Sequence, residues 1–166
     1  MKYSAFVVEE SGKSNFKGSV KSLDTQDLPS GEVLIRVTYS SVNYKDALSA
    51  SGNKGVTRSF PHTPGIDAAG IVEHSTDSSF KVGQEVLVIG YDLGMNTAGA
   101  FGEFIRVPSD WVVLKPESIT SKQAMSWGTA GFTSALCIEK LISAGITRDQ
   151  GTVIVSGATG GVGSVA

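Results

Sequence analysis

The sequence predicts a mixed α/β protein in two parts: a β-rich part, then the beginning of a doubly wound parallel sheet. Three observations lead to this fold class. Short apolar runs bounded by glycine and proline follow one another up to about Pro116, as in a β-barrel or sandwich. After Pro116 the apolar residues recur at helical spacing. Residues 151–166 then pass from a β-branched run into a glycine-rich turn, the order found where a parallel strand leads into a helix.

The strands of the first part are predicted from apolar runs between turn residues. The clearest is 32–39, in which every second residue from Val33 to Tyr39 is apolar, as on a half-buried strand. The turn at 28–31 contains proline and glycine and leads into this strand. The remaining predicted strands are 3–8, 68–72, 85–89, 101–107 and 111–114.

The second part carries helix signals and then a strand signal. Thr120 and Gln123 have the spacing of a capping box, and apolar residues repeat helically from Phe132 to Ile142. Gly145 then predicts the end of that helix. The β-branched run 153–155 predicts a buried strand. The glycines after it predict a turn whose backbone N–H groups hold a phosphate, and a glycine turn without a ligand is the alternative.

Composition excludes several classes of function. The formal net charge is −2, which argues against nucleic acid or an anionic membrane as the main partner. The single cysteine, Cys137, excludes an intrachain disulfide and a multi-cysteine zinc site, and we expect its thiol to be packed. No apolar stretch reaches the length of a membrane span, and the first apolar run is too short for a signal peptide. We expect a cytoplasmic protein.

Six short motifs follow one another along the chain. They are SVNYKDA at 41–47, PGIDAAGIV at 64–72, VGQEV at 82–86, GAFGE at 99–103, GTAGFT at 128–133 and GATGGVG at 157–163. In this order they resemble the medium-chain dehydrogenase/reductase superfamily. Within it the chain is most similar to the zinc-free quinone oxidoreductase branch, which includes the acrylyl-CoA reductases.

The resemblance implies a GroES-like barrel as the catalytic domain over residues 1–117. It also implies an NADP-binding Rossmann domain, of which residues 118–166 are the first part. The implied reaction is hydride transfer from NADPH to an activated double bond, as in an acrylyl-CoA-like enoyl thioester, or to a quinone. The full-length enzyme is expected to be a homodimer. Because the second βαβ half lies beyond residue 166 in this fold, we expect the chain alone to bind NADPH weakly and to be inactive.

A second class of function stays open beside the enzyme. The β-rich module could be a non-catalytic GroES-like unit that serves in binding or assembly. The discriminating observation is whether the natural gene continues with the second half of the nucleotide-binding domain.

The residues at the family's zinc positions do not suit zinc. In the zinc alcohol dehydrogenases that the chain resembles, a cysteine stands at the place of Asn43, a histidine at Ile66 and a further cysteine near Thr129. None of these three side chains is a zinc ligand, since zinc takes thiolate, imidazole or carboxylate groups. Asp67 alone cannot hold the ion. The sequence therefore predicts no metal.

Without zinc, other groups must stabilise the oxygen that gains charge during reduction. Tyr44 is the candidate catalytic residue, because its phenol can donate a proton and its ring can lie against a nicotinamide. The alternative is a tyrosine that only packs or binds the cofactor. Asn43 is the second candidate and is expected to hold Tyr44 or the substrate. Asp46 and Asp67 either fix this network or are buried structural carboxylates.

The cofactor-binding residues are implied by the resemblance. The family places Thr129 near the cofactor, although a hydroxyl at that position can also cap a helix. Backbone contacts to the pyrophosphate are expected from Thr159, Gly160, Gly161 and Val162.

The absence of zinc ligands is directly testable. We expect elemental analysis of the purified chain to find zinc far below one equivalent per polypeptide. Stoichiometric zinc that survives dialysis would contradict this prediction.

Overall fold

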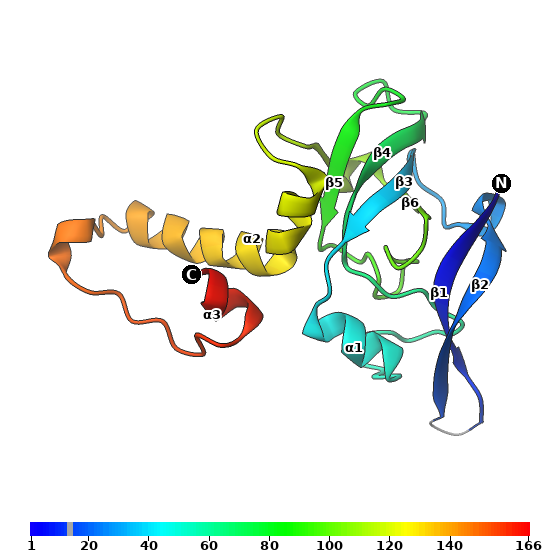
Figure 1. The fold of residues 1–166 in the computed structure, drawn as a ribbon, viewed down its shortest axis with the longest axis horizontal. Coiled ribbons are helices and arrows are strands. Elements are labelled where there is room, and N and C mark those ends of the chain that lie inside the picture. Colours follow the sequence, from blue (N-terminus) through cyan, green and yellow to red (C-terminus); the bar gives the residue numbers. More distant parts are fainter. Residues whose placement is uncertain (13–14) are drawn as a thin grey trace. The chain divides into compact units, whose positions relative to one another are not determined.

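The computed structural model describes residues 1–12 and 15–166, which form two compact units, Met1–Ser126 and Trp127–Ala166. The first unit holds the sheets and the second is helical with a long irregular segment (Figure 1). Each unit is described by itself below.

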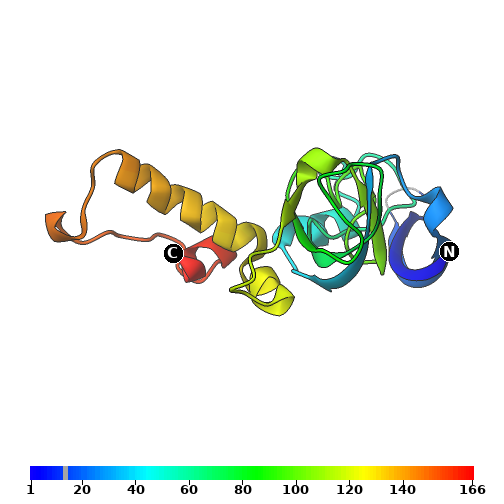
Figure 2. The same cartoon turned by 90° about the horizontal axis from the view of Figure 1, so that it is seen from above.

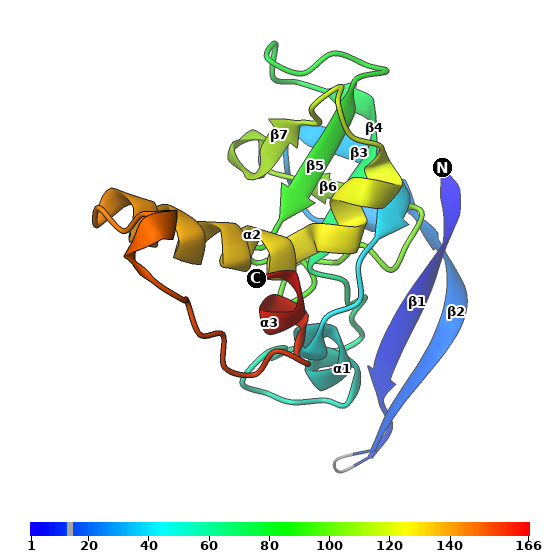
Figure 3. The same ribbon diagram turned by 60° about the vertical axis from the view of Figure 1, so that its left-hand side comes forward.

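The first unit is built on a five-stranded antiparallel sheet (Figures 1 and 3). Its strand order is β6-β3-β4-β5-β7. Seen from above, this sheet curls around its own core (Figure 2). The strands are β3 (Val33–Ser40), β4 (Asp67–Ser75), β5 (Glu85–Ile89), β6 (Phe104–Val107) and β7 (Val112–Leu114).

A two-stranded ribbon, β1 (Lys2–Glu10) with β2 (Phe16–Asp24), lies beside this sheet. Backbone hydrogen bonds join it to the segment before β6: Phe6 N–H donates to the Phe101 carbonyl at 2.7 Å, and Glu103 N–H donates to the Ser4 carbonyl at 3.0 Å. β2 was not predicted because it is polar and mostly exposed, and pairing with β1 rather than burial defines it.

The core of the sheet consists of β-branched and small residues on its inner face. Val33, Ile35 and Ile105 are fully buried there. The predicted alternation along β3 holds at Val33 and Ile35 but is wrong at Tyr39, which is 47% exposed. The register shift between Val37 and Tyr39 is the reason, since the residue added on β3 there turns the later side chains to the other face.

The cap predicted for the longer helix is confirmed. α1 (Tyr44–Ala50) begins after Asn43, and α2 (Ser121–Ser143) begins after Thr120. The Thr120 capping box is confirmed, because Gln123 N–H donates to Thr120 Oγ1 at 3.2 Å and Thr120 N–H donates to Gln123 Oε1 at 2.9 Å. The same helix is broken at Gly128, whose φ of 48° is non-helical. Three short 3-10 turns and α3 (Gly161–Val165) complete the chain; the turns are Thr25–Asp27, Ser109–Trp111 and Arg148–Gln150.

The C-terminal end of α2 also follows its sequence signal. Gly145 has a φ of 81°, and the N–H of Ile146 reaches back to the Leu141 carbonyl at 3.0 Å. This is the hydrogen bond that a glycine in the left-handed conformation allows after a helix.

Two predictions for the second unit are wrong. Residues 153–155 form no strand, and their side chains are exposed, Ile154 by 90%. The reason is that no other strand in the described part of the chain pairs with them. Cys137 is exposed rather than packed, and it lines a cleft on α2.

A search of the described residues found no helix with both the length and the apolar character needed to cross a bilayer.

The buried position of Ile35 gives a stability prediction. Ile35→Ala should lower the free energy of unfolding by about 2–5 kcal/mol, because it leaves a cavity in a core that is fully buried. The control is Val113→Ala on β7, where the side chain is 56% exposed and the change should stay within about 0.5 kcal/mol. Urea unfolding of both variants measures the difference, and equal losses would contradict the assignment of the core.

Candidate functional site

The candidate catalytic residues lie where three strands of the first unit meet at one end of the sheet. β3 ends beside the start of β4, since Ser40 pairs with Ala68. β5 ends beside the same point, since Ile89 pairs with Asp67. The segment after β3 carries Asn43 and Tyr44, so the sheet register brings this segment to Asp67.

Ser41, Asn43 and Asp67 form a hydrogen-bonded cluster at this end of the sheet. Ser41 Oγ donates to Asp67 Oδ2 at 2.5 Å. The amide of Asn43 donates from Nδ2 to the same Oδ2 at 3.0 Å and to Ser41 Oγ at 2.8 Å. Asp67 is fully buried. These bonds fix the orientation of the Asn43 side chain.

Asp46 joins the same two segments through their backbones. Its Oδ2 accepts from Asn43 N–H at 2.7 Å and its Oδ1 accepts from Ile66 N–H at 3.0 Å. The side chain is only 2% exposed. Burial raises the pKa of Asp46 and the neighbouring Asp67 carboxylate adds to the rise, while the two backbone donors oppose it. The carboxylate therefore connects the start of α1 to the start of β4.

Tyr44 is the first residue of α1 and extends into solvent. Its exposed fraction is 81%, and Val42 beside it is 84% exposed. A tyrosine and a valine this exposed are available to a ligand. The structure thus joins Asn43, Ser41, Asp46 and Asp67 into one network and leaves the Tyr44 ring outside it.

The second unit carries the glycine-rich turn of the sequence. Gly157 has a φ of 67°, and a Cβ on Gly163 would collide with the Gly157 carbonyl. Glycine is therefore required where α3 packs on the turn. Gly160 N–H donates to the Gly157 carbonyl at 2.9 Å, so this donor closes the turn. Gly161 and Val162 open α3, where N–H groups have no acceptor within a helix.

A tight glycine turn that leads into the N-terminus of a helix fits the diphosphate of a dinucleotide. Thr159 lies exposed in this turn. Thr129 follows the break at Gly128, and its carbonyl accepts from Thr133 Oγ1 at 2.7 Å. A Cβ on Gly161 would stand 3.5 Å from that of Ala130, so the start of α3 packs beside the segment that carries Thr129.

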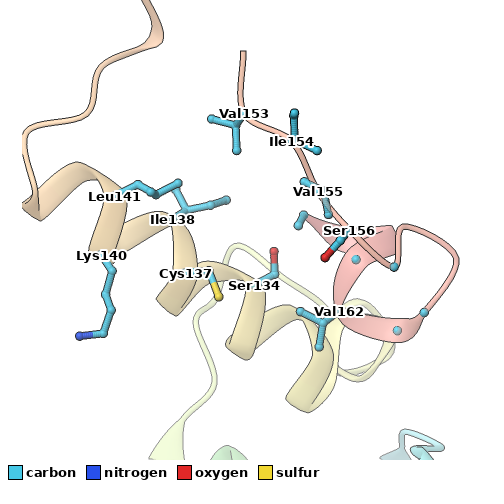
Figure 4. Close-up of a pocket in the computed structure, with 15 residues that line it drawn as sticks. Ser134, Cys137, Ile138, Lys140, Leu141, Val153, Ile154, Val155, Ser156 and Val162 are labelled. Atoms are coloured by element: carbon cyan, nitrogen blue, oxygen red, sulfur yellow. The ribbon is translucent and has the colours of Figure 1, made fainter. Parts of the chain in front are cut away.

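An apolar cleft of about 850 Å³ lies within the second unit (Figure 4). Ile138 and Leu141 on α2 face Val153 across it, while Lys140 points away. The lining also includes Gly160, Gly161 and Val162. Its walls suit apolar groups rather than the charges of a diphosphate, so only the glycine turn at its edge has the chemistry of a phosphate site.

Sequence reasoning missed Ser41, the residue that joins Asn43 to Asp67. The only sequence signal for Ser41 is its place two residues before Asn43 in the motif SVNYKDA, which is a weak indication of a role. His62 is buried: it is 7% exposed, and its Nε2 lies 2.9 Å from the Gly94 carbonyl oxygen. Within the part of the chain that the structure describes, no group of three or more histidine, cysteine or acidic side chains is placed to hold a metal.

Comparison with known families identifies the first unit. Residues 29–117 match the alcohol dehydrogenase GroES-like domain, which is more than half of the chain. The chain belongs to this family. Its placement in the medium-chain dehydrogenase/reductase superfamily, beside acrylyl-CoA reductases and quinone oxidoreductases, is confirmed by its relatives.

Two relatives of this chain carry the names of enzymes. Acrylyl-CoA reductase AcuI of Ruegeria pomeroyi is 46% identical over 99% of this chain and 50% of its own length. Quinone oxidoreductase of Sus scrofa is 35% identical over 81% of this chain and 39% of its own length. The chain thus spans about half the length, or less, of these relatives.

Solved structures confirm the predicted fold class. The yhdH oxidoreductase of Salmonella enterica, crystallised with NADP, has a TM-score of 0.93 and 44% identity over 99% of this chain and 50% of its own. Bacillus subtilis yhfP, crystallised with NAD, has a TM-score of 0.94 and 41% identity with the same two coverages. The β-rich GroES-like part and the start of the nucleotide-binding part are therefore shared with these oxidoreductases.

The two hydrogen bonds of Asp46 give a prediction for this site. Asp46→Asn should lower the free energy of unfolding by about 1–3 kcal/mol at pH 7, because an amide has one acceptor oxygen and leaves one buried N–H unpaired. Asp110→Asn is the control, since Asp110 is exposed and its change should stay within about 0.5 kcal/mol. Urea unfolding measures both, and a wild-type stability for Asp46→Asn would show that these bonds do not hold α1 in place.

Proposed function

We propose that this chain is the catalytic part, with the beginning of the nucleotide-binding part, of a zinc-independent NADPH-dependent oxidoreductase. Its substrate is an activated double bond, as in an acrylyl-CoA-like enoyl thioester, or a quinone. The observation that carries the proposal is the hydrogen-bonded cluster of Ser41, Asn43 and Asp67 beside an exposed Tyr44, in a chain of this family. The division into residues 1–117 and 118–166 is part of the proposal.

The glycine turn would hold the cofactor's diphosphate through the N–H groups at the start of α3, with Thr159 and Thr129 beside it. NADPH, when bound, supplies the hydride. The names of the relatives support both the cofactor and the substrate classes, since one relative was crystallised with NADP and another is an acrylyl-CoA reductase. Because yhfP was crystallised with NAD, the preference for NADPH belongs to the proposal.

Tyr44 would lie against the cofactor and present its phenol to the substrate. Reduction leaves negative charge on the substrate oxygen, and an O–H donor stabilises it or passes a proton to the neighbouring carbon. Asn43 is a positioning residue, because its amide is already committed to Ser41 and Asp67. The side chains at the family's zinc positions offer no metal ligands, so these donors take over the electrostatic work.

The test is an assay of a fusion between residues 1–166 and the second half of the Ruegeria pomeroyi relative. We expect loss of NADPH absorbance with acrylyl-CoA or with a quinone. If the phenol donates the proton, Tyr44→Phe should lower kcat by a factor of about 10²–10⁴. If only the ring contributes, Tyr44→Phe should leave the kinetics unchanged and Tyr44→Ala should raise the KM for NADPH. Lys45→Ala, an exposed neighbour, is the control.

A folded fusion that binds NADPH and reduces neither substrate would contradict the proposed function. Fluorescence titration of the 166-residue chain with NADPH tests the expected weak binding, and micromolar affinity would contradict that expectation.

A further inference from the structure

Tyr91 has an unusual backbone conformation in the turn that follows β5. Among residues 1–12 and 15–166, it is the one residue other than glycine with a positive φ, 54°. Gly90 before it has a φ of 79°. The left-handed region is crowded for a large side chain, and such outliers gather at ligand sites. Glycine would adopt this turn without strain. A tyrosine at this position is therefore better explained by what its side chain does than by the backbone.

The ring of Tyr91 is held on one side and open on the other. It stacks on Trp111 with centroids 5.3 Å apart and planes inclined by 7°. Its hydroxyl donates to the Asp110 carbonyl at 3.1 Å. Trp111 in turn packs against the core of the sheet. Tyr91 is still 62% exposed, so the face away from Trp111 meets solvent.

This open ring face lies at the same end of the sheet as the candidate catalytic cluster. Ile89, at the end of β5, pairs with Asp67, and Gly90 N–H donates to the Ile66 carbonyl at 3.1 Å. β3 and β5 flank β4, which places the segments that leave them about 10 Å apart. Tyr91 and the segment of Tyr44 thus leave the sheet on either side of Asp67.

We propose that Tyr91, backed by Trp111, is a substrate-binding residue that stacks on a flat conjugated ring of the substrate. The inference rests on the proposed function and adds the specificity element to it. Both substrate classes contain such a ring, the quinone itself or the adenine of a coenzyme A thioester. The Tyr91 ring, held in place by Trp111, can bind a quinone ring or an adenine ring by offset stacking. The strained turn is retained because it presents the ring with its open face outward.

The test is a titration of the 166-residue chain, followed by the NMR signals of the Tyr91 ring and the Trp111 indole. The probes are menadione and coenzyme A. We expect one probe to shift both residues' signals, and its identity tells which ring is bound. Tyr91→Gly suits the left-handed backbone and removes the ring, so it should weaken that binding about tenfold. Tyr91→Phe keeps the ring and should bind as the wild type does.

The proposal is overturned if neither probe moves these signals, or if Tyr91→Gly binds both probes as tightly as the wild type. This readout needs no turnover. A fusion that fails to oxidise NADPH would therefore defeat the proposed function while the Tyr91 titration is judged separately.

Discussion

The candidate site depends on one buried carboxylate that bridges two chain segments. Asp46 accepts one backbone N–H from Asn43 and another from Ile66, so it fixes the start of α1 against the start of β4. Backbone N–H donors at both oxygens allow a carboxylate to be buried without a basic side chain. Removing this bridge would leave the segment that carries Tyr44 attached to the start of β4 through the hydrogen bonds of Ser41 and Asn43 to Asp67.

The same end of the sheet is ordered by hydrogen bonds among its own side chains. In the zinc alcohol dehydrogenases that the chain resembles, a cysteine and a histidine stand at the positions of Asn43 and Ile66. Here Asn43 and Ser41 are drawn to Asp67 by hydrogen bonds at 2.5–3.0 Å. The packing of Ile66, which is 4% exposed, fills another of the ligand positions with an apolar side chain. Hydrogen bonding and packing thus order this segment.

Local sequence signals predicted the elements that are determined by interactions between residues close in sequence. The Thr120 capping box, the Gly145 helix end and the strands with apolar runs all appear where the pattern indicated. The misses have tertiary causes. β2 exists because β1 offers it hydrogen bonds, and Tyr39 is exposed because a register shift intervenes. Ser41 and Tyr91 acquire their roles only when β4 brings distant segments together, and no sequence spacing reveals that.

The two units differ in how completely their polar groups are hydrogen-bonded and their apolar side chains are covered. In the first unit the described polar side chains that are buried all have hydrogen-bond partners, and the sheet encloses its core. The second unit exposes Ile154, Val153 and Ile142 by 60% or more, and its cleft is apolar. Contiguous exposed apolar area of this kind is typical of a surface that makes further contacts. A glycine turn binds a diphosphate well only when its N–H groups are held in place. The N–H groups of the glycine turn therefore belong to a unit whose apolar side chains are still exposed.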